Sequence, residues 1–165
     1  MQFASLVVAA GIGLGWCGIA GAIGPHDDPH WIEAESLREL PAGIQVLLGV
    51  GLPSRDGGIA DRGDRFNVSD VLADGLPMRR FALGIVNGDT VLVAVEHGGR
   101  GYSVQTLEFR QVGAVWAAVR CAVTGKVPRA GTELLETLAT HPRPDLLACR
   151  LPGVMTSAAQ PTASR

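Results

Sequence analysis

The chain has no tract rich in lysine or arginine, and its formal net charge is only −2 over 165 residues. Proteins that bind nucleic acid need a concentrated positive surface to displace counterions from phosphates. The charge pattern therefore argues against a nucleic-acid partner. With 47% hydrophobic and 18% charged residues, the composition is typical of a globular protein, and the length fits a single domain.

Motifs that mark common catalytic chemistry are also missing. The sequence contains no Gly-x-Ser-x-Gly elbow, no Gly-x-x-x-x-Gly-Lys phosphate loop, no His-Glu-x-x-His zinc helix and no Cys-x-x-Cys pair. His26, Asp27, Asp28 and His30 carry suitable metal-binding atoms, but two neighbouring prolines predict an extended terminus that fixes no geometry. We therefore expect no cofactor and no metal site.

Cysteine is scarce, with three residues in the chain. Cys17 lies in an apolar N-terminal segment, and its removal with that segment would leave Cys121 and Cys149 as an even pair. In an oxidising compartment such a pair predicts a disulfide, which would tie the C-terminal segment to the last expected strand. The alternative is two buried free thiols.

Residues 3–23 carry no charge and include the small-residue sequence Ala20-Gly21-Ala22. This pattern predicts a secretory signal, residues 1–22, cleaved after Ala22, and a periplasmic or secreted bacterial protein that leaves the membrane after cleavage. No lysine or arginine precedes the apolar stretch, so an uncleaved membrane anchor stays open. Lipidation at Cys17 is a further alternative, against which the bulky Trp16 argues.

The rest of the chain reads as one domain, residues 23–151, followed by a tail, 152–165, with the composition of a disordered segment. Its centre, 79–123, alternates apolar, β-branched runs with glycine turns and predicts an antiparallel meander. Asn87-Gly88 is a strong hairpin signal. A capping box at Ser36 and Glu39 predicts helix from Ser36, and Thr132 is the expected cap of a short C-terminal helix.

The register of the hairpin has two solutions. A two-residue Asn-Gly loop agrees best with turn chemistry, whereas a three-residue loop that includes Asp89 sets Arg80 opposite Glu96. The three-residue register also puts six apolar side chains on one face: Phe81, Leu83, Ile85, Val91, Val93 and Val95. In the next strand, Val104 and Leu107 fall on different faces, which predicts a bulge near Gln105 or Thr106.

These elements predict an α+β fold, with N-terminal helices packed on a four- to five-stranded antiparallel meander and a short C-terminal helix. In general architecture this arrangement resembles cystatin-like and nuclear-transport-factor-like (NTF2-like) domains. The resemblance concerns architecture alone and implies no activity.

The candidate site is the long polar, glycine-rich interval 51–64, because long loops in small domains are often functional. Its charges and a neighbouring turn supply the predicted partner-binding residues: Arg55, Asp56, Asp61, Arg62, Asp64 and Arg100. The plain alternative is a solvated loop held by its own Arg–Asp pairs. Together with export and the missing catalytic motifs, the loop predicts a non-enzymatic protein-binding module, most concretely an immunity or inhibitor protein that blocks a toxic or hydrolytic effector.

Two further functions stay open. A carrier of small apolar ligands would need a pocket, for which we select Phe81, Leu83, Val93 and Trp116. A small hydrolase or isomerase would use Glu96, His97 and an aspartate from the loop. Adjacent strand residues point to opposite faces, so Glu96 and His97 could share a site only across a bulge.

Overall fold

The computed structural model describes residues 30–54, 57–71, 73, 75–141, 149 and 151–152. Two N-terminal helical segments, six strands and a C-terminal helix follow in chain order: β1 (Ile32–Ala34), η1 (Leu37–Glu39), α1 (Ala42–Leu48), β2 (Ile59–Ala60), β3 (Arg79–Asn87), β4 (Thr90–His97), β5 (Ser103–Val112), β6 (Val115–Thr124) and α2 (Gly131–Thr140). The predicted α+β class is confirmed. The predicted signal segment and almost all of the predicted tail lie outside the described residues.

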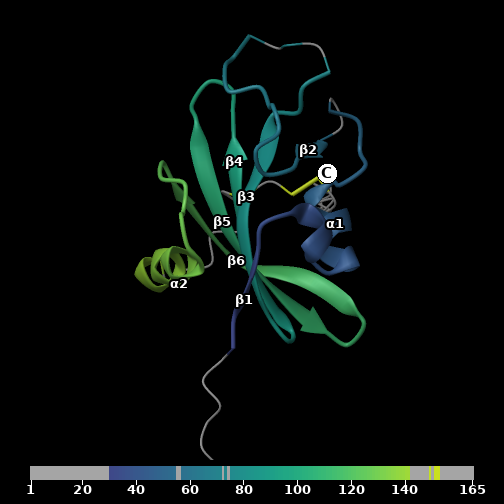
Figure 1. Ribbon diagram of the computed structural model, residues 1–165, viewed down its shortest axis with the longest axis vertical. Coiled ribbons are helices and arrows are strands. Elements are labelled where there is room, and N and C mark those ends of the chain that lie inside the picture. The colour runs from purple at the N-terminus through teal and green to yellow at the C-terminus, as the bar shows by residue number, and fades with distance from the viewer. Residues whose placement is uncertain are drawn as a thin grey trace, which may run out of the picture.

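The strands form one twisted sheet in the order β1-β3-β4-β5-β6, with every neighbouring pair in this order antiparallel (Figure 1). The predicted meander is β3 to β6. Two short strands on the free edge of β3 bring the sheet to six strands, against the four to five predicted. There β1 pairs near Gly84, and β2, which lies within the expected loop, pairs in parallel with Arg79 and Arg80.

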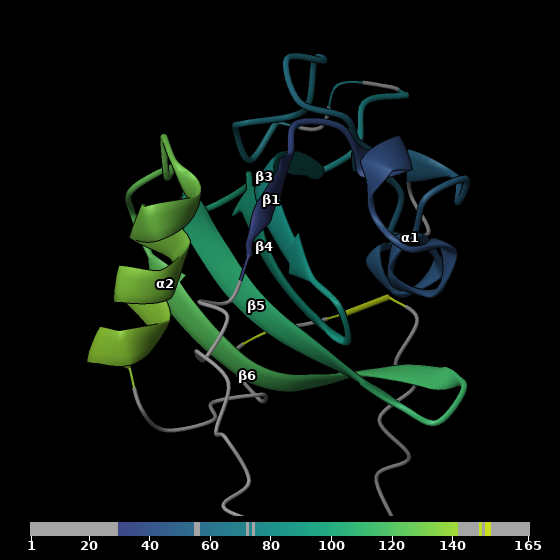
Figure 2. The same cartoon turned by 60° about the horizontal axis from the view of Figure 1, so that its bottom comes forward.

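Both faces of the sheet are covered. On one face, η1 and α1 pack their leucines and Ile44 on Phe81, Phe109 and alternate valines of β4. On the other face, Leu134 and Leu138 of α2 pack on a second cluster that includes Leu92 and Val104. Figure 2 shows α1 and α2 on either side of the central strands. This double coverage explains why the central strands are apolar at consecutive positions.

The β3–β4 hairpin adopts neither predicted register at its turn. Asn87 pairs with Thr90, so the loop residues are Gly88 and Asp89. Gly88 has a φ of 56° and Asp89 has no positive φ. This is the pattern of a type II′ turn, which needs glycine at its first central position.

A bulge at Ala82 restores the predicted charge pair further along the hairpin. The register shifts between Phe81 and Leu83, and beyond the shift Arg80 lies opposite Glu96. The six apolar side chains therefore do not share a face as predicted. Leu83 and Ile85 belong to the α2 side, while Phe81 belongs to the α1 side.

The bulge predicted near Gln105 or Thr106 is absent from the β4–β5 pairing, which is continuous. Because helices cover both faces, Val104 and Leu107 can point in opposite directions without one. The irregularity lies instead between β5 and β6, where Glu108 pairs with Arg120 and Phe109 with Ala118, leaving Val119 as the extra residue.

Of the two predicted helix caps, the one before η1 is present and the one before α2 is not. The capping box of Ser36 and Glu39 is present, although the helix it begins is a single 3-10 turn. Thr132 does not cap α2, which starts at Gly131 after Ala130 without a side-chain cap from its own segment. The carboxylate of Glu33 in β1 accepts a hydrogen bond from the Gly131 amide at 2.6 Å instead. A distant strand thus supplies the negative charge that a helix N-terminus favours.

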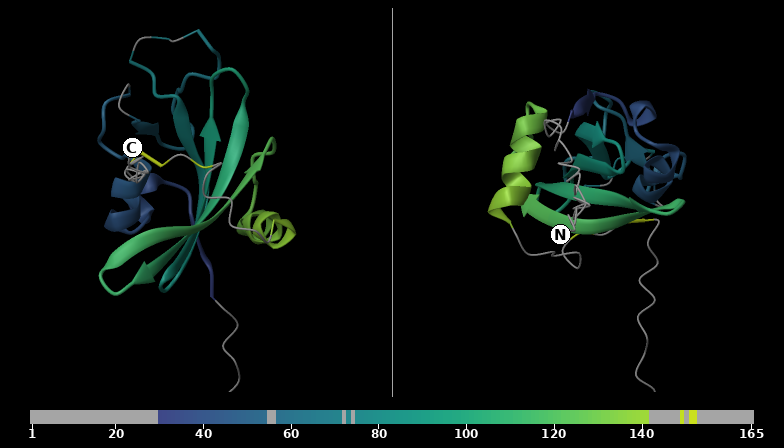
Figure 3. Two further views of the ribbon diagram at one scale, coloured as in Figure 1. Left: turned by 180° about the vertical axis from the view of Figure 1, so that it is seen from behind. Right: turned by 90° about the horizontal axis from the view of Figure 1, so that it is seen from below.

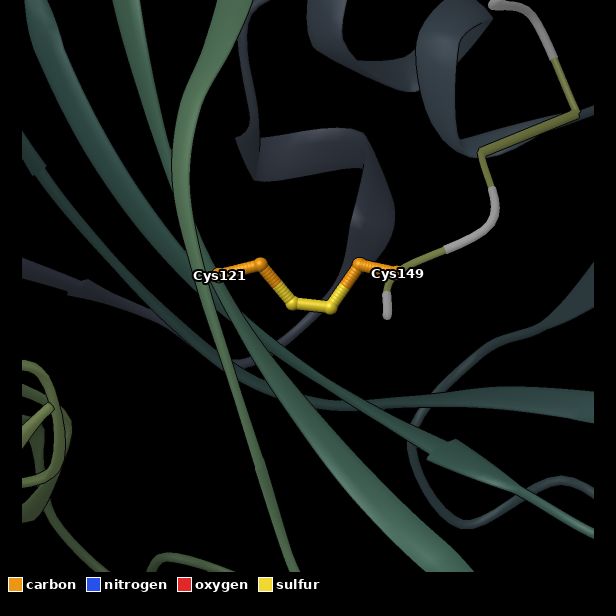
Figure 4. Close-up of a disulfide and its surroundings, with 2 residues drawn as sticks. All are labelled: Cys121 and Cys149. Atoms are coloured by element: carbon orange, nitrogen blue, oxygen red, sulfur yellow. A yellow bond between two sulfur atoms is a disulfide. The ribbon is translucent and has the colours of Figure 1, made fainter. Parts of the chain in front are cut away.

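Cys121 in β6 and Cys149 are joined as a disulfide, with their Cα atoms 6.3 Å apart (Figure 4). Both cysteines are buried in the α1-side cluster. The bond holds Cys149 against the last strand, as predicted. Among the described residues, no helix has the length and apolar character needed to span a bilayer.

Candidate functional site

The described residues of the predicted partner-binding set lie in two segments. Asp61, Arg62 and Asp64 follow β2, and Arg100 lies in the turn between β4 and β5. Both segments are at the same end of the sheet, the upper end in Figure 1. Arg55 and Asp56 lie outside the described residues, so their predicted role stays a prediction.

Asp61 anchors the loop to the rest of the fold. Its carboxylate accepts hydrogen bonds from the Ser36 hydroxyl at 2.6 Å, the Leu37 amide at 2.9 Å and the Arg62 amide at 2.8 Å. Burial alone would raise the pKa of Asp61, but these hydrogen bonds outweigh it and lower the pKa below its ordinary value. Both oxygens of this carboxylate are therefore engaged inside the protein.

A second anchor is the Glu96 cluster, which we define as Phe66, Arg80, Glu96 and Tyr102. Arg80 donates to both oxygens of the buried Glu96, at 2.8 and 3.1 Å. Tyr102 donates to the same carboxylate at 2.6 Å, and the Arg80 guanidinium stacks 4.3 Å from the ring centroid of Phe66. The hydrogen bond with Glu96 raises the pKa of Arg80, while burial and Glu96 raise that of Tyr102 to about 12.

The cluster ties the charged loop to the sheet. Arg80 also donates to the backbone carbonyl of Asp64 at 3.2 Å, while Tyr102 follows the turn that carries Arg100. The side chains of Arg62, Asp64, Arg65 and Arg100 remain exposed. A fixed backbone thus presents these four charges, with Arg62 also 3.4 Å from Glu35.

Replacing Gly98 by alanine should destabilise this end of the protein by about 2 kcal/mol, because the new methyl group meets packed backbone. A Cβ at Gly98 would lie 1.7 Å from the carbonyl oxygen of Asn67. Urea unfolding of Gly98→Ala measures the effect. Gly125→Ala is the matched control, since no heavy atom lies within 4 Å of its Cβ position. Equal stabilities of the two variants would contradict the tight contact between Gly98 and residues 67–68.

The proposed catalytic pair is divided between the two faces of the sheet. Glu96 faces Arg80 and Tyr102, whereas His97 lies opposite Arg79 in the register and interacts with Gln105. Burial and the positive charge of Arg79 lower the pKa of His97 to about 4. The structure therefore does not bring Glu96 and His97 into a common site.

Arg79 links three elements from within the protein. Its guanidinium donates to the carbonyl of Leu48, the last residue of α1, at 2.5 Å and to the carbonyl of Gly57. Burial lowers its pKa to about 10. Since cations stabilise helix C-termini, Arg79 has a structural role next to His97.

The residues selected for a carrier pocket do not line one cavity. Phe81 and Val93 are buried in the α1-side cluster and Leu83 in the α2-side cluster. Trp116 packs against α1, where a Cβ at Gly43 would lie 2.7 Å from its Cδ1 atom. The four side chains thus fill two separate cores.

The structure does contain a cavity that the sequence did not reveal. It has a volume of about 510 Å³ and lies beside α2 and the β3–β4 turn, with Trp31, Glu108, Arg110 and Arg120 among its lining residues. The alternation of β5 places Glu108 and Arg110 on one face, and this could have indicated a shared site. The contribution of Arg120 depends on the β5–β6 register, which the sequence leaves open.

Comparison of the chain with protein-family models, with curated proteins and with solved structures finds no match.

Proposed function

We propose that this protein is an exported, non-enzymatic binding module that recognises another protein, most concretely an inhibitor or immunity protein that blocks a toxic or hydrolytic effector. Its recognition surface combines the charged loop after β2 with the β4–β5 turn. We define this recognition surface by its exposed residues Arg62, Asp64, Arg65, Val68, Val71, Arg100 and Tyr102.

The observation that supports the proposal is the anchoring of this loop. The Asp61 hydrogen bonds hold its beginning against η1, and Arg80 holds the carbonyl of Asp64. A loop that is already ordered loses little conformational entropy on binding. Inhibitors that enter a cleft benefit from such preorganisation, and the charges orient the encounter.

The composition of the surface also fits an interface. Arginine and tyrosine are enriched where proteins bind each other, and the recognition surface contains three arginines and one tyrosine. Val68 and Val71 are 57% and 75% exposed beside them. Apolar side chains flanked by charges can be desolvated together when a partner covers the loop.

Export is the second part of the proposal. It is supported by the uncharged stretch 3–23, which includes a small-residue cleavage pattern. The pairing of Cys121 with Cys149 agrees with it, because disulfides persist in oxidising compartments such as the bacterial periplasm.

The test is capture of the partner by the purified chain, followed by affinity measurement. The triple variant Arg62→Ala, Asp64→Ala, Arg100→Ala should lose about 2 kcal/mol of binding free energy and the matching part of its inhibition. Asp61 is left intact, because its replacement would release the loop. The control carries Arg129→Ala and Glu136→Ala, two exposed charges near and on α2.

Isothermal titration calorimetry gives the affinities, and an activity assay of the captured protein shows whether it is an inhibited enzyme. Equal affinity of the triple variant and the control would refute the recognition surface. A captured enzyme that stays fully active in the complex would refute inhibition.

A further inference from the structure

The cavity beside α2 is built around a buried carboxylate. The side chain of Glu108 is only 5% exposed, and it lies on the face of β5 that α2 covers. Arg110 donates to its Oε1 at 2.8 Å, and Arg120 donates to its Oε2 from Nε at 2.8 Å. The Nη2 atom of Arg120 lies 2.7 Å from the same oxygen. One carboxylate thus faces two guanidinium groups.

The two arginines differ in how many of their guanidinium nitrogen atoms already donate to an acceptor in the described part of the chain. Arg120 uses Nε and Nη2 on Glu108 and Nη1 on the carbonyl of Leu138 at 3.2 Å. Arg110 uses only Nε, and within the described part of the chain its two Nη atoms have no acceptor. Its side chain is 61% exposed. Arg110 is therefore held in place by Glu108 while its outer donors remain available.

The remaining walls of the cavity combine apolar and charged side chains. Trp31, half-buried against the α2-side core, and Leu135 provide apolar surface, while Asp89 lies at the turn. The Oδ1 atom of Asp89 accepts a hydrogen bond from the Thr90 hydroxyl. A guanidinium with two parallel donors matches a carboxylate in geometry and charge, and an indole matches a flat apolar group.

We propose that this cavity binds a small aromatic carboxylate, with the carboxylate on the Nη atoms of Arg110 and the ring against Trp31. Its volume of about 510 Å³ lies within the range of small-molecule sites. Glu108 acts as a positioning residue that orients Arg110. A cationic ligand fits less well, because both oxygens of Glu108 accept from arginines and Oδ1 of Asp89 accepts from the Thr90 hydroxyl. This site is separate from the recognition surface and does not depend on it.

The test uses NMR titration of the full chain with phenylacetate and indoleacetate, and with neutral phenylacetamide as the matched ligand. The carboxylates should shift the indole N–H signal of Trp31, and the amide should bind about tenfold more weakly or worse. Arg110→Gln should abolish this preference, while Arg129→Gln, an exposed arginine outside the cavity, should retain it.

Three results would overturn the proposal. These are no shift by either carboxylate up to roughly 10 mM, equal binding of acid and amide, or unchanged binding by a folded Arg110→Gln variant. The dispersed spectrum of each variant shows that it is folded. Because Arg110 lies largely on the surface, its replacement leaves the apolar core intact.

Discussion

Replacing Cys121 and Cys149 together by serine should lower the free energy of unfolding by about 3 to 4 kcal/mol. The two cysteines are 28 residues apart, and a cross-link of that span restricts the unfolded chain considerably. The bond also attaches Cys149 to β6, which lies at the end of the described strand order. Without the bond, the leucine and proline at 151–152 should separate from the α1 side.

Urea unfolding with and without reductant checks this prediction. Reduction of the parent chain should lower its midpoint toward that of the double variant and leave the variant unchanged. For measurements on the full-length chain, which keeps residues 1–22, Cys17→Ser is the control and should behave like the parent. A midpoint that reductant does not move would show that the cross-link contributes little. A Cys121→Ala, Cys149→Ala variant separates the cross-link from the cost of burying serine hydroxyls.

The second large effect is a dependence of stability on pH that originates at His97. Burial and the charge of Arg79 depress its folded pKa to about 4, against an ordinary value of 6.5. Between these values the unfolded chain binds a proton that the folded chain does not. Stability is therefore complete above pH 6.5 and is lost as the pH falls toward 4, by up to about 3 kcal/mol.

Unfolding free energies of the parent and His97→Asn at several pH values between 4 and 7 measure this contribution. The variant cannot take up the proton, so its stability should fall less steeply than that of the parent over this interval. His141→Gln is the control, because His141 is exposed at the end of α2 and lies far along the chain from Arg79. Parallel curves for the parent and His97→Asn would assign the pH dependence to other groups.

Local signals in the sequence predicted the fold well where the determining residues are neighbours. Asn87-Gly88 marks the hairpin, Ser36 and Glu39 mark the capping box, and both are present. The turn register was wrong because it depends on the bulge at Ala82, several residues away. That bulge allows Arg80 to face Glu96 while Leu83 packs under α2. Only the packing of both faces decides between such registers.

In the candidate site too, the sequence predicted what neighbouring residues determine and missed what distant contacts determine. The sequence indicated which loop is charged, but not that Asp61 is an internal anchor, since its donors come from Ser36 and Leu37, well before it in the chain. The geometry at Glu108 was equally inaccessible, because the β5–β6 shift sets which residue of β6 faces it. Contacts between distant segments decide whether a charged residue is an internal anchor or an exposed residue.

The hydrogen bond from Gly131 to Glu33 joins the first strand to the last helix of the described chain, 98 residues apart. During synthesis, β1 exists long before the helix whose first turn it completes, and Leu134 and Leu138 of that helix cover part of one sheet face. A growing chain therefore cannot complete this face of the sheet until α2 has been made. Such late closure suits the proposed export, since a polypeptide threaded through a secretion channel has to stay unfolded until it emerges.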